Sequence, residues 1–492
     1  MISARDDIER IVGPLIDGEV LASESEGTID VVNPSTGRRL LEIPSGGKTD
    51  ADRAVASARR AYDDGRWSES PPSVRKAALH RLADFIAAHC GALDALDAGE
   101  MGKPVGEPFA NAKAAAGLLR FYAESVDKLT GDVYRSDRHS FVSQTWVPRG
   151  VVAAVTPWNF PTMNAVRKIA PALAAGNCVV LKPSELASRS AVKLAQLATH
   201  AGLPPGVLNV VPGLGSTVGK ALGLHPDVDM LTFTGSTAIG KLMLEYASQS
   251  NMKPVIAECG GKSPQIVFDD GVNLDEVSES IAKFIVTNQG QICSVGSRVL
   301  VQKSVEKALT QKLAQRFSRV SIGNAEDPKT TFGPIVSAKQ CTAVMRYIDS
   351  GHAEGARLIS GGRRVLESSG GYFVEPTLFA GVSPSATIAQ EEIFGPVLSV
   401  IPFEDQEDAI RIANGTIYGL MAYVWTASLS TGMRMAKALR SSVRISARMP
   451  SGEGAGHAYS FEPARQSGVG TETGLAGMAS YMRRQLIWID HA

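Results

Sequence analysis

The sequence predicts an α/β protein built around a doubly wound parallel sheet. From about residue 150 onward, short apolar, β-branched runs alternate with helical stretches in the order GVVAAVTP, CVVLKPS, VLNVVPG, MLTFTGS, PVIAECGG and QIVFDD. This alternation is the βαβ signature of a parallel sheet that helices cover on both faces. The length of 492 residues is several times that of an ordinary domain, so about two or three domains and a large core are expected.

The segments on either side of this sheet follow other patterns. Between about residues 50 and 125 the pattern is helical, as in ALHRLADFIAAHC, whose leucines and isoleucine recur at steps of three and four. The stretch 134–146 predicts an antiparallel excursion. A second α/β block is expected after Cys293, with VGSRVLVQ as a strand, a helix over 307–316 and strands near 397–402. No long Pro/Ser linker separates these blocks, so closely packed domains are expected.

Composition excludes several classes of protein. Lys plus Arg and Asp plus Glu each number 50, so no net field favours nucleic acid or a membrane surface as a partner. The residues MISARDDIERIVGPL lack the basic and apolar regions of a signal peptide, and no window of about 18 apolar residues occurs. The five cysteines form no CxxC pair, so reduced thiols, no metal site and a cytoplasmic location are expected.

Cys293 is the cysteine most suited to chemistry. It lies in NQGQICSVGSR, after a helical run over 275–286 and among small residues, where a thiol can be reached. A buried structural cysteine is the alternative, because free cysteine is among the most buried residue types. A nucleophilic thiol also needs a base or a lowered pKa, and no histidine lies near Cys293 in the sequence.

Three other segments have side chains or backbone suited to chemistry. Glu258 ends an apolar strand in IAECGGKSP, the position at which open α/β sheets place functional groups, although a surface salt bridge is the alternative. Asn159 in TPWNFP is an amide that could donate to an oxyanion, or only a turn residue. LTFTGSTAIGK reads as a strand, a glycine turn and a helix start that points N–H groups near Gly235 and Ser236 at an anion. PGLGSTVG, which contains Gly219, is a turn before a helix.

Taken together, the order of these segments resembles the NAD(P)-dependent aldehyde dehydrogenase superfamily. The matching segments are TPWNFP, KIAPALAAGN, KPSE, FTGST, ECGGKSP, NQGQICS, EEIFGPV and NGTIYGL, from about residue 30 to about residue 425. The resemblance implies an aldehyde-dehydrogenase-like fold of three parts. They are an NAD-binding domain over 1–125 and 147–258, an α/β catalytic domain over 259–466, and a small β oligomerisation arm over 126–146 and 467–492. Pairing of the arm between subunits implies a homodimer or homotetramer.

The resemblance also implies the catalytic residues. Cys293 resembles the thiol that attacks the aldehyde to form a thiohemiacetal, and Asn159 with the Cys293 N–H resembles the oxyanion hole. Glu258 matches the general base, which implies that the thioester is hydrolysed rather than passed to coenzyme A. Lys168 matches a lysine that organises the active site, and Glu472 in TETG matches an outer proton-relay carboxylate.

Cofactor and substrate residues follow from the same resemblance. Lys182 and Glu185 match contacts to the adenosine ribose, and a carboxylate there would repel the 2′-phosphate of NADP, so NAD is favoured and NADP is the less favoured alternative. Ser236 matches a pyrophosphate contact, Glu392 a contact to the nicotinamide ribose, and Phe394 a brace for nicotinamide. The remaining cofactor positions are Thr156, Pro157, Trp158, Ser184, Gly219, Phe233 and Gly235, and the substrate positions are Phe160, Arg167, Ile292 and Ser294.

The C-terminal third departs from the family pattern. A usual G-x-V-W-x-N reads SSVRISA, which puts Arg444 at the aromatic position and Ser446 at the asparagine. A usual PFGG-x-K-x-SG-x-GRE reads SFEPARQSGVGTE, with Thr471 in place of the arginine. These departures, between Arg444 and Thr471, affect the inference of substrate and not the core chemistry.

The sequence therefore predicts an enzyme that oxidises an aldehyde to the acid with NAD⁺. One alternative is a semialdehyde dehydrogenase, because Arg167 stands where succinic-semialdehyde-type enzymes carry an arginine and could hold a substrate carboxylate in two hydrogen bonds. A solvated or ion-paired helix arginine is the opposing interpretation. Other classes are a cysteine esterase, disfavoured by the lack of a histidine near Cys293, and a catalytically silent scaffold, disfavoured by the intact Cys293, Glu258 and Asn159.

Overall fold

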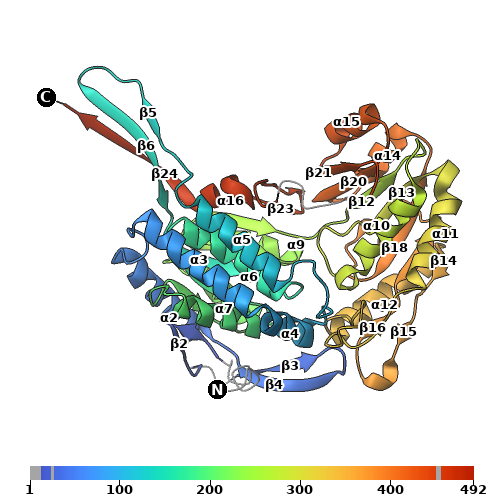
Figure 1. Ribbon diagram of the computed structural model, residues 1–492, viewed down its shortest axis with the longest axis horizontal. Coiled ribbons are helices and arrows are strands. Elements are labelled where there is room, and N and C mark those ends of the chain that lie inside the picture. Colours follow the sequence, from blue (N-terminus) through green and yellow to red (C-terminus); the bar gives the residue numbers. More distant parts are fainter. Residues whose placement is uncertain (1–12, 24–26, 450–455, 492) are drawn as a thin grey trace.

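An eight-stranded sheet forms the larger body of the molecule (Figure 1). The computed structural model describes residues 13–23, 27–449 and 456–491. The sheet has the order β2-β1-β9-β8-β7-β10-β11-β23. Strands β7 to β11 run parallel to one another, and because β8 lies on one side of β7 and β10 on the other, the chain winds in both directions from β7. The bounds are β1 (Leu15–Ile16), β2 (Glu19–Val20), β7 (Val151–Val155), β8 (Cys178–Lys182), β9 (Leu208–Val210), β10 (Met230–Thr234), β11 (Val255–Glu258) and β23 (Gly468–Val469).

Helices cover this sheet, and the predicted helical block is confirmed. Leu79, Leu82 and Ile86 are all buried, as their spacing predicts. The segment PGLGSTVG forms a short π-helix, η1 (Gly215–Gly219), which leads into the next α-helix. The helices are α2 (Lys48–Asp63), α3 (Pro72–Ala88), α4 (Cys90–Met101), α5 (Ala112–Ser125), α6 (Pro161–Ala174), α7 (Arg189–His200), α8 (Lys220–Leu224) and α9 (Thr237–Gln249).

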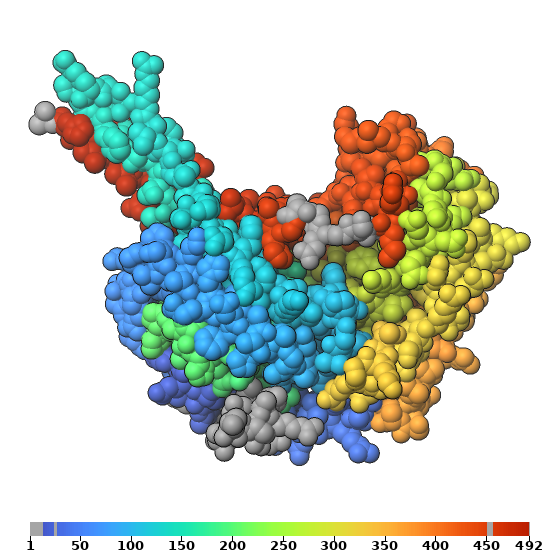
Figure 2. All heavy atoms as spheres, viewed as in Figure 1, coloured from blue at the N-terminus to red at the C-terminus, as the bar shows by residue number. Residues whose placement is uncertain are grey.

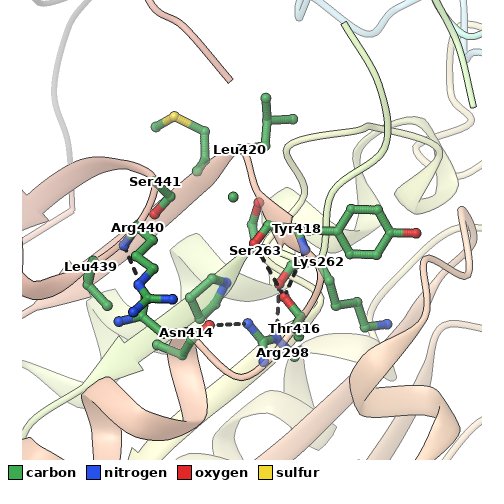
Figure 3. Close-up of a pocket in the computed structure, with 14 residues that line it drawn as sticks. Lys262, Ser263, Arg298, Asn414, Thr416, Tyr418, Leu420, Leu439, Arg440 and Ser441 are labelled. Atoms are coloured by element: carbon green, nitrogen blue, oxygen red, sulfur yellow. Dashed lines mark hydrogen bonds between the residues drawn. The ribbon is translucent and has the colours of Figure 1, made fainter. Parts of the chain in front are cut away.

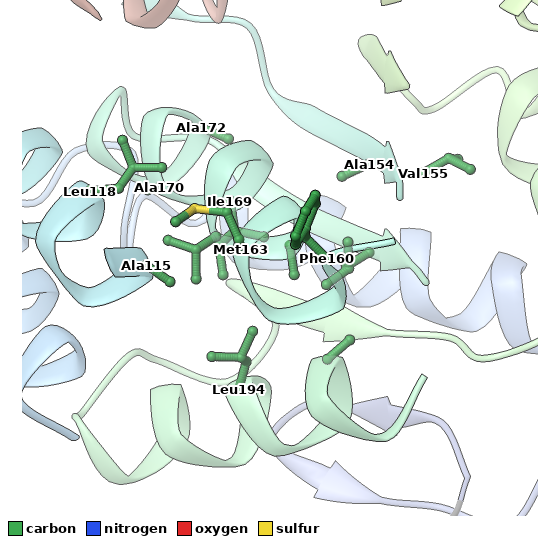
Figure 4. Packing of buried hydrophobic residues seen from close by; sticks show 14 of the residues in the cluster. Ala115, Leu118, Ala154, Val155, Phe160, Met163, Ile169, Ala170, Ala172 and Leu194 are labelled. Atoms are coloured by element: carbon green, nitrogen blue, oxygen red, sulfur yellow. The ribbon is translucent and has the colours of Figure 1, made fainter. Parts of the chain in front are cut away.

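Helix α6 is the packing centre of this body. Figure 4 shows alanine, leucine and methionine side chains of α5, α6 and α7 meeting Ala154 and Val155 of β7. Small side chains such as Ala170 and Ala172 let α6 approach its neighbours closely. Arg167 is the only residue of α6 that is not buried, so this otherwise buried helix presents one guanidinium away from the core.

A second, seven-stranded sheet forms the other lobe, with the order β14-β17-β18-β13-β12-β20-β21. All its pairings are parallel except that of β14 with β17. The predicted strands near residue 298 and residue 397 are present, as is the helix predicted over 307–316 between them. The bounds are β12 (Pro264–Val267), β13 (Arg298–Gln302), β14 (Arg357–Ser360), β17 (Thr377–Ala380), β18 (Val397–Phe403), β20 (Met421–Trp425), β21 (Ser442–Ser446), α10 (Leu274–Val286), α11 (Glu306–Phe317), α12 (Ala338–Ala353), α13 (Thr387–Gln390), α14 (Gln406–Ala413) and α15 (Leu429–Ala438).

The expected antiparallel excursion is a three-stranded arm that projects from the body (Figures 1 and 2). Strands β5 (Asp132–Tyr134) and β24 (Met482–Asp490) pair with the two sides of β6 (Ser140–Pro148). Short pairings elsewhere join β3 (Thr28–Asn33) to β4 (Arg38–Pro44), β15 (Arg364–Val365) to β16 (Phe373–Val374) and β19 (Tyr418–Gly419) to β22 (Ala464–Arg465). None of the described helices is long and apolar enough to cross a membrane.

The segment 467–492 is divided between the arm and the larger sheet. Strand β23 pairs with β11, and Cys259 N–H donates to Ser467 O at 2.8 Å. Helix α16 (Gly474–Ser480) packs on α6, and only β24 joins the arm. The assignment of the whole segment to the arm is therefore wrong for β23, because the outer edge of β11 needs a hydrogen-bonding partner and this part of the chain supplies it. Of the N-terminal part of the predicted NAD-binding domain, 1–12 lie outside the described residues.

Candidate active site

The ends of three parallel strands converge on one cavity. Strand β7 ends just before Thr156, β10 just before Gly235, and β11 at Glu258, and these strands are neighbours in the sheet. Open α/β sheets bind ligands at the carboxyl ends of their strands, at the point where the strand order reverses. The strand ends open into a cavity of about 1360 Å³, which also reaches β20 and β21 of the other lobe. In Figure 2 the surface is hollowed between the blue helical body and the orange lobe.

Cys293 and Asn159 both line this cavity. Asn159 Nδ2 donates to Gln291 O at 2.9 Å, and Asn159 Oδ1 accepts from Asn164 Nδ2 at 3.0 Å. Asn288 Nδ2 donates to Asn159 O at 2.8 Å, which ties the cysteine loop to the turn after β7. The Asn159 amide is thus held through its oxygen and one N–H, and its second N–H has no partner among the described residues.

The loop before Cys293 has a strained backbone. Asn288 and Gln289 have φ values of 48° and 55°, in the left-handed region that non-glycine residues seldom adopt. At Gly290, with φ of 68°, a Cβ would lie 2.5 Å from Gly395 O, so only glycine fits. A strained, over-determined loop of this kind is often found at functional sites, because the surrounding contacts hold reactive groups in one position.

The surroundings of Cys293 favour the protonated thiol over the thiolate. Cys293 is partly exposed to the cavity. Desolvation, together with the charges of Glu392 and Glu258, raises the pKa of its thiol to about 12, and the guanidinium of Arg167 opposes this rise. Because the thiolate is the nucleophile, a base must take its proton.

Glu258 is a buried carboxylate that lines the same cavity as Cys293. It is 5% exposed, and its Oε1 has no hydrogen-bond partner among the described residues. Burial raises the pKa of Glu258 well above its usual value, the charge of Glu472 raises it further, and Lys168 and Arg167 lower it. A carboxyl whose pKa is raised toward neutrality can both accept and return a proton.

Lys168 and Glu472 form a buried ion pair next to Glu258. Lys168 Nζ donates to Glu472 and also to Phe233 O at 3.3 Å. Both side chains are almost fully buried, and Glu472 lines the cavity. Lys168 therefore holds a second carboxylate beside Glu258. The charge of Glu472 also acts on Glu258.

One side of the cavity offers hydrogen bonds and aromatic faces suited to a dinucleotide. Ser236 caps helix α9 through its Oγ, which accepts from Ile239 N–H at 3.4 Å. Glu392 Oε1 accepts from Gly261 N–H at 3.0 Å, and burial raises the pKa of Glu392 to about 7. The rings of Trp158 and Phe394 meet edge to face with centroids 5.2 Å apart.

The remaining predicted cofactor residues lie outside the lining of this cavity. The residues that line it are Pro157, Trp158, Gly235, Ser236, Glu392 and Phe394, and those that do not are Thr156, Lys182, Ser184, Glu185, Gly219 and Phe233. Lys182 ends β8, on the far side of β7, and its Nζ lies 3.2 Å from Glu185 Oε2. The order of the strands explains this separation. A long ligand that begins at the end of β11 and crosses the ends of β10 and β7 would reach β8 last.

The other side of the cavity is lined by predicted and unpredicted residues. Phe160, Arg167, Ile292 and Ser294 are all present there. Sequence analysis missed Phe109, Lys283, Phe284, Tyr423, Tyr459 and Phe461, which line the same side. Tyr423 OH donates to Ser294 O at 3.0 Å, and its ring packs on Phe284 with centroids 5.4 Å apart. The period-two pattern of MAYVW, in which alternate residues share one strand face, is the signal that points to Tyr423.

A second, much smaller cavity lies within the lobe of the seven-stranded sheet (Figure 3). Arg298 donates to Lys262 O, Ile412 O and Ala413 O at 2.9, 3.2 and 3.0 Å. Burial lowers the pKa of Arg298 to about 9 and that of Lys262 to about 7. The space holds at most about one water molecule, so Arg298 acts here as a brace between β13 and the end of α14.

The site and the fold together define a class of enzyme. The model of the aldehyde dehydrogenase family matches residues 21–487, and the chain belongs to this family. It is an NAD(P)-dependent oxidoreductase that oxidises an aldehyde to the carboxylic acid.

Similar proteins cover nearly the whole chain. The NADP/NAD-dependent aldehyde dehydrogenase PuuC of Escherichia coli (strain K12) is 40% identical over 476 residues, which are 96% of this chain and 95% of that protein. An indole-3-acetaldehyde dehydrogenase solved with NAD⁺ superposes with a TM-score of 0.95 at 43% identity, covering 99% of this chain and 98% of that one. A gamma-glutamyl-gamma-aminobutyraldehyde dehydrogenase from Burkholderia cenocepacia superposes with a TM-score of 0.95 at 42% identity, covering 99% of both chains.

Proposed function

We propose that Cys293 is the nucleophile and Glu258 the base of this oxidation. Glu258 takes the thiol proton while Cys293 Sγ bonds to the aldehyde carbon, and the carbonyl electrons move to its oxygen as a thiohemiacetal oxyanion. The free N–H of Asn159 and the N–H of Cys293 donate to that oxygen. The observation that supports this assignment is the convergence of Cys293, Glu258 and Asn159 on one cavity.

The second half of the reaction releases the acid. A bound nicotinamide would accept the hydride from the thiohemiacetal carbon, which leaves a thioester on Cys293. Glu258 passes the thiol proton to solvent and then takes a proton from water, whose oxygen attacks the thioester carbon and breaks the C–S bond, so that the acid leaves and Cys293 returns as the thiolate. The buried, raised-pKa carboxyl of Glu258 favours this hydrolysis over release to coenzyme A.

We infer that the cofactor is NAD rather than NADP. The supporting feature is Glu185, whose partly exposed carboxylate is joined to Lys182 at the end of β8. The first turn after such a strand is where an acidic residue binds a ribose hydroxyl, and where a 2′-phosphate would be repelled. Ser184 lies in the same turn, and its Oγ accepts from Leu186 N–H at 3.3 Å.

A carboxylate-bearing semialdehyde is the second candidate substrate, held by Arg167. The supporting feature is the Nε of Arg167, which is buried and has no hydrogen-bond partner among the described residues. The guanidinium lies in the cavity with Cys293 and opposes the rise in its thiol pKa. An arginine with unused donors can hold a planar carboxylate in two hydrogen bonds.

We also propose a cytoplasmic homodimer or homotetramer in which the arm pairs between subunits. Strands β5 and β24 form the open edges of the arm sheet. Large apolar side chains on the arm are exposed, including Val133 at 72% and Trp488 at 63%. Exposed apolar strands of this kind need a covering surface.

The central test is NADH formation from a panel of aliphatic, aromatic and carboxylate-bearing aldehydes. We expect turnover by the unaltered enzyme and none by Cys293→Ala, with NAD⁺ binding retained. Glu258→Gln should lower both the initial burst of NADH and the steady turnover, because thiol deprotonation and thioester hydrolysis both lose their base. Full turnover by Cys293→Ala would refute the assignment, and ester hydrolysis without NADH would favour the esterase class.

A further inference from the structure

Strand β21 presents a second arginine to the cavity. Strands β20 and β21 are parallel, and their register sets Met421, Tyr423 and Trp425 opposite Ser442, Arg444 and Ser446. Alternate residues of a strand share a face, and these six all line the cavity. Arg444 is therefore the direct neighbour of Tyr423 on the face that looks toward the substrate side.

The contacts of Tyr423 place Arg444 relative to the thiol. Tyr423 OH donates to the backbone oxygen of Ser294, the residue after Cys293. Arg444 is exposed, whereas Tyr423 is held by this bond and by the ring of Phe284. Moving outward from Cys293, the cavity wall thus runs from Ser294 to Tyr423 and then to Arg444 at the mouth.

A second cation faces the same part of the cavity. Lys283 lies next to Phe284 on helix α10, and its exposed side chain lines the cavity. The end of β21 approaches the same helix, because Met449 N–H donates to Glu276 Oε2 at 2.8 Å. Arg444 and Lys283 therefore stand on two elements that flank the Phe284 and Tyr423 rings.

Within the described part of the chain, neither cation has an anionic partner. No ion pair or side-chain hydrogen bond joins Arg444 or Lys283 to a described residue. The carboxylates that line the cavity are Glu107, Glu258, Glu392 and Glu472. Glu107 Oε1 accepts from Phe109 N–H at 2.9 Å, Glu472 is paired with Lys168, and Glu258 and Glu392 adjoin the thiol.

We propose that Arg444 and Lys283 form an anion-binding subsite at the mouth of the cavity, which takes the negatively charged far end of an extended aldehyde. The inference rests on the proposed function, since the aldehyde end must reach Cys293. The aromatic wall of Phe109, Phe160, Phe284 and Tyr423 would cover the apolar chain between the two ends. Arg167 lies deeper, beside Glu258, so a carboxylate on a short aldehyde would meet Arg167 and one on a long aldehyde would meet Arg444.

The test compares ω-carboxyaldehydes of increasing chain length with their methyl esters, which have nearly the same shape but no charge. In the unaltered enzyme, kcat/KM should favour the acid over its ester for the long members. Arg444→Leu should lower kcat/KM for the long acids about tenfold and leave the esters and short acids unchanged within about twofold. Arg444→Lys should keep part of the preference for long acids over their esters. Lys283→Met should also lower that preference.

Arg448→Leu is the matched control, because Arg448 is an exposed arginine of the same segment that does not line the cavity. It should leave all substrates unchanged. Added salt should weaken the preference of the unaltered enzyme for long acids and have no such effect on Arg444→Leu. An equal loss for acids and esters would assign Arg444 a structural role and overturn the subsite, as would no loss at all. If even the esters give no NADH with the unaltered enzyme, the proposed function itself fails.

Discussion

The two sides of the large cavity are built in different ways. On the cofactor side, Glu392 is bonded to the backbone at Gly261, Ser236 caps a helix, and Trp158 packs on Phe394. On the substrate side, Arg167, Lys283 and Arg444 have no ion-pair partner in the described ranges 13–23, 27–449 and 456–491.

The difference teaches where each kind of selectivity resides. Side chains that are already bonded or packed within the protein lose little conformational entropy when a ligand binds. Such a fixed arrangement suits a cofactor that is the same in every turnover. Unpartnered cations gain most from a ligand that supplies the missing charge, so they discriminate between substrates. Changes on the cofactor side should thus affect all aldehydes alike, and changes on the substrate side only some.

The largest effect is expected between the two sides, at Asn159. Asn159→Ala removes a donor to the oxyanion and should lower kcat about 10²- to 10³-fold for every aldehyde. Steady-state kinetics with neutral and charged aldehydes measures this, with NAD⁺ binding as the control for folding. A loss confined to one substrate class would place Asn159 on the substrate side instead.

Arg167→Leu should give the next largest effect. Loss of a charged, two-bond contact should raise KM for short carboxylate-bearing semialdehydes roughly 10- to 100-fold and leave neutral aldehydes near the original value. Arg167→Lys keeps the charge without the planar donors and should lie between. An equal rise in KM for neutral aldehydes would contradict the proposed difference between the two sides of the cavity.

Glu185→Ala tests the cofactor side. Removal of the carboxylate should lower KM for NADP⁺ by about tenfold, because the 2′-phosphate no longer meets a negative charge. The change should be the same with every aldehyde. An unaltered ratio of NAD⁺ to NADP⁺ use would show that Glu185 does not set the preference.

The smallest effect is on the ionisation of the thiol. Glu392 raises the pKa of Cys293, so Glu392→Gln should lower that pKa and increase the thiolate fraction at any pH below it. The rate of inactivation by iodoacetamide at about pH 8 should rise roughly threefold to tenfold. Glu391→Gln is the control, since Glu391 is bonded to Tyr347 OH and is not among the charges that act on the thiol. Slower inactivation of Glu392→Gln would contradict the conclusion that Glu392 raises the pKa of Cys293.

Much of the fold could be predicted because its pattern is local. Each parallel strand is a short apolar run followed by a turn, and the helices after Pro161 and Ser236 begin where proline and a capping serine indicate. The pairing of β23 with β11 could not be predicted, because β23 is only two residues long. Its pairing depends on the backbone N–H and C=O groups at the outer edge of β11, which have no other described strand to bond.

The sequence by itself determined the alternation of strands and helices along the chain and the class of enzyme. It also determined Cys293, Glu258 and Asn159 as the candidates for its chemistry, because motifs and periodicity reside in neighbouring residues. Only the tertiary structure decided that Lys168 holds Glu472 against Glu258 and that Arg444 shares a cavity wall with Tyr423. These pairs are distant in the chain, and their electrostatic effects depend on burial and on the distance between charges, which no local pattern encodes.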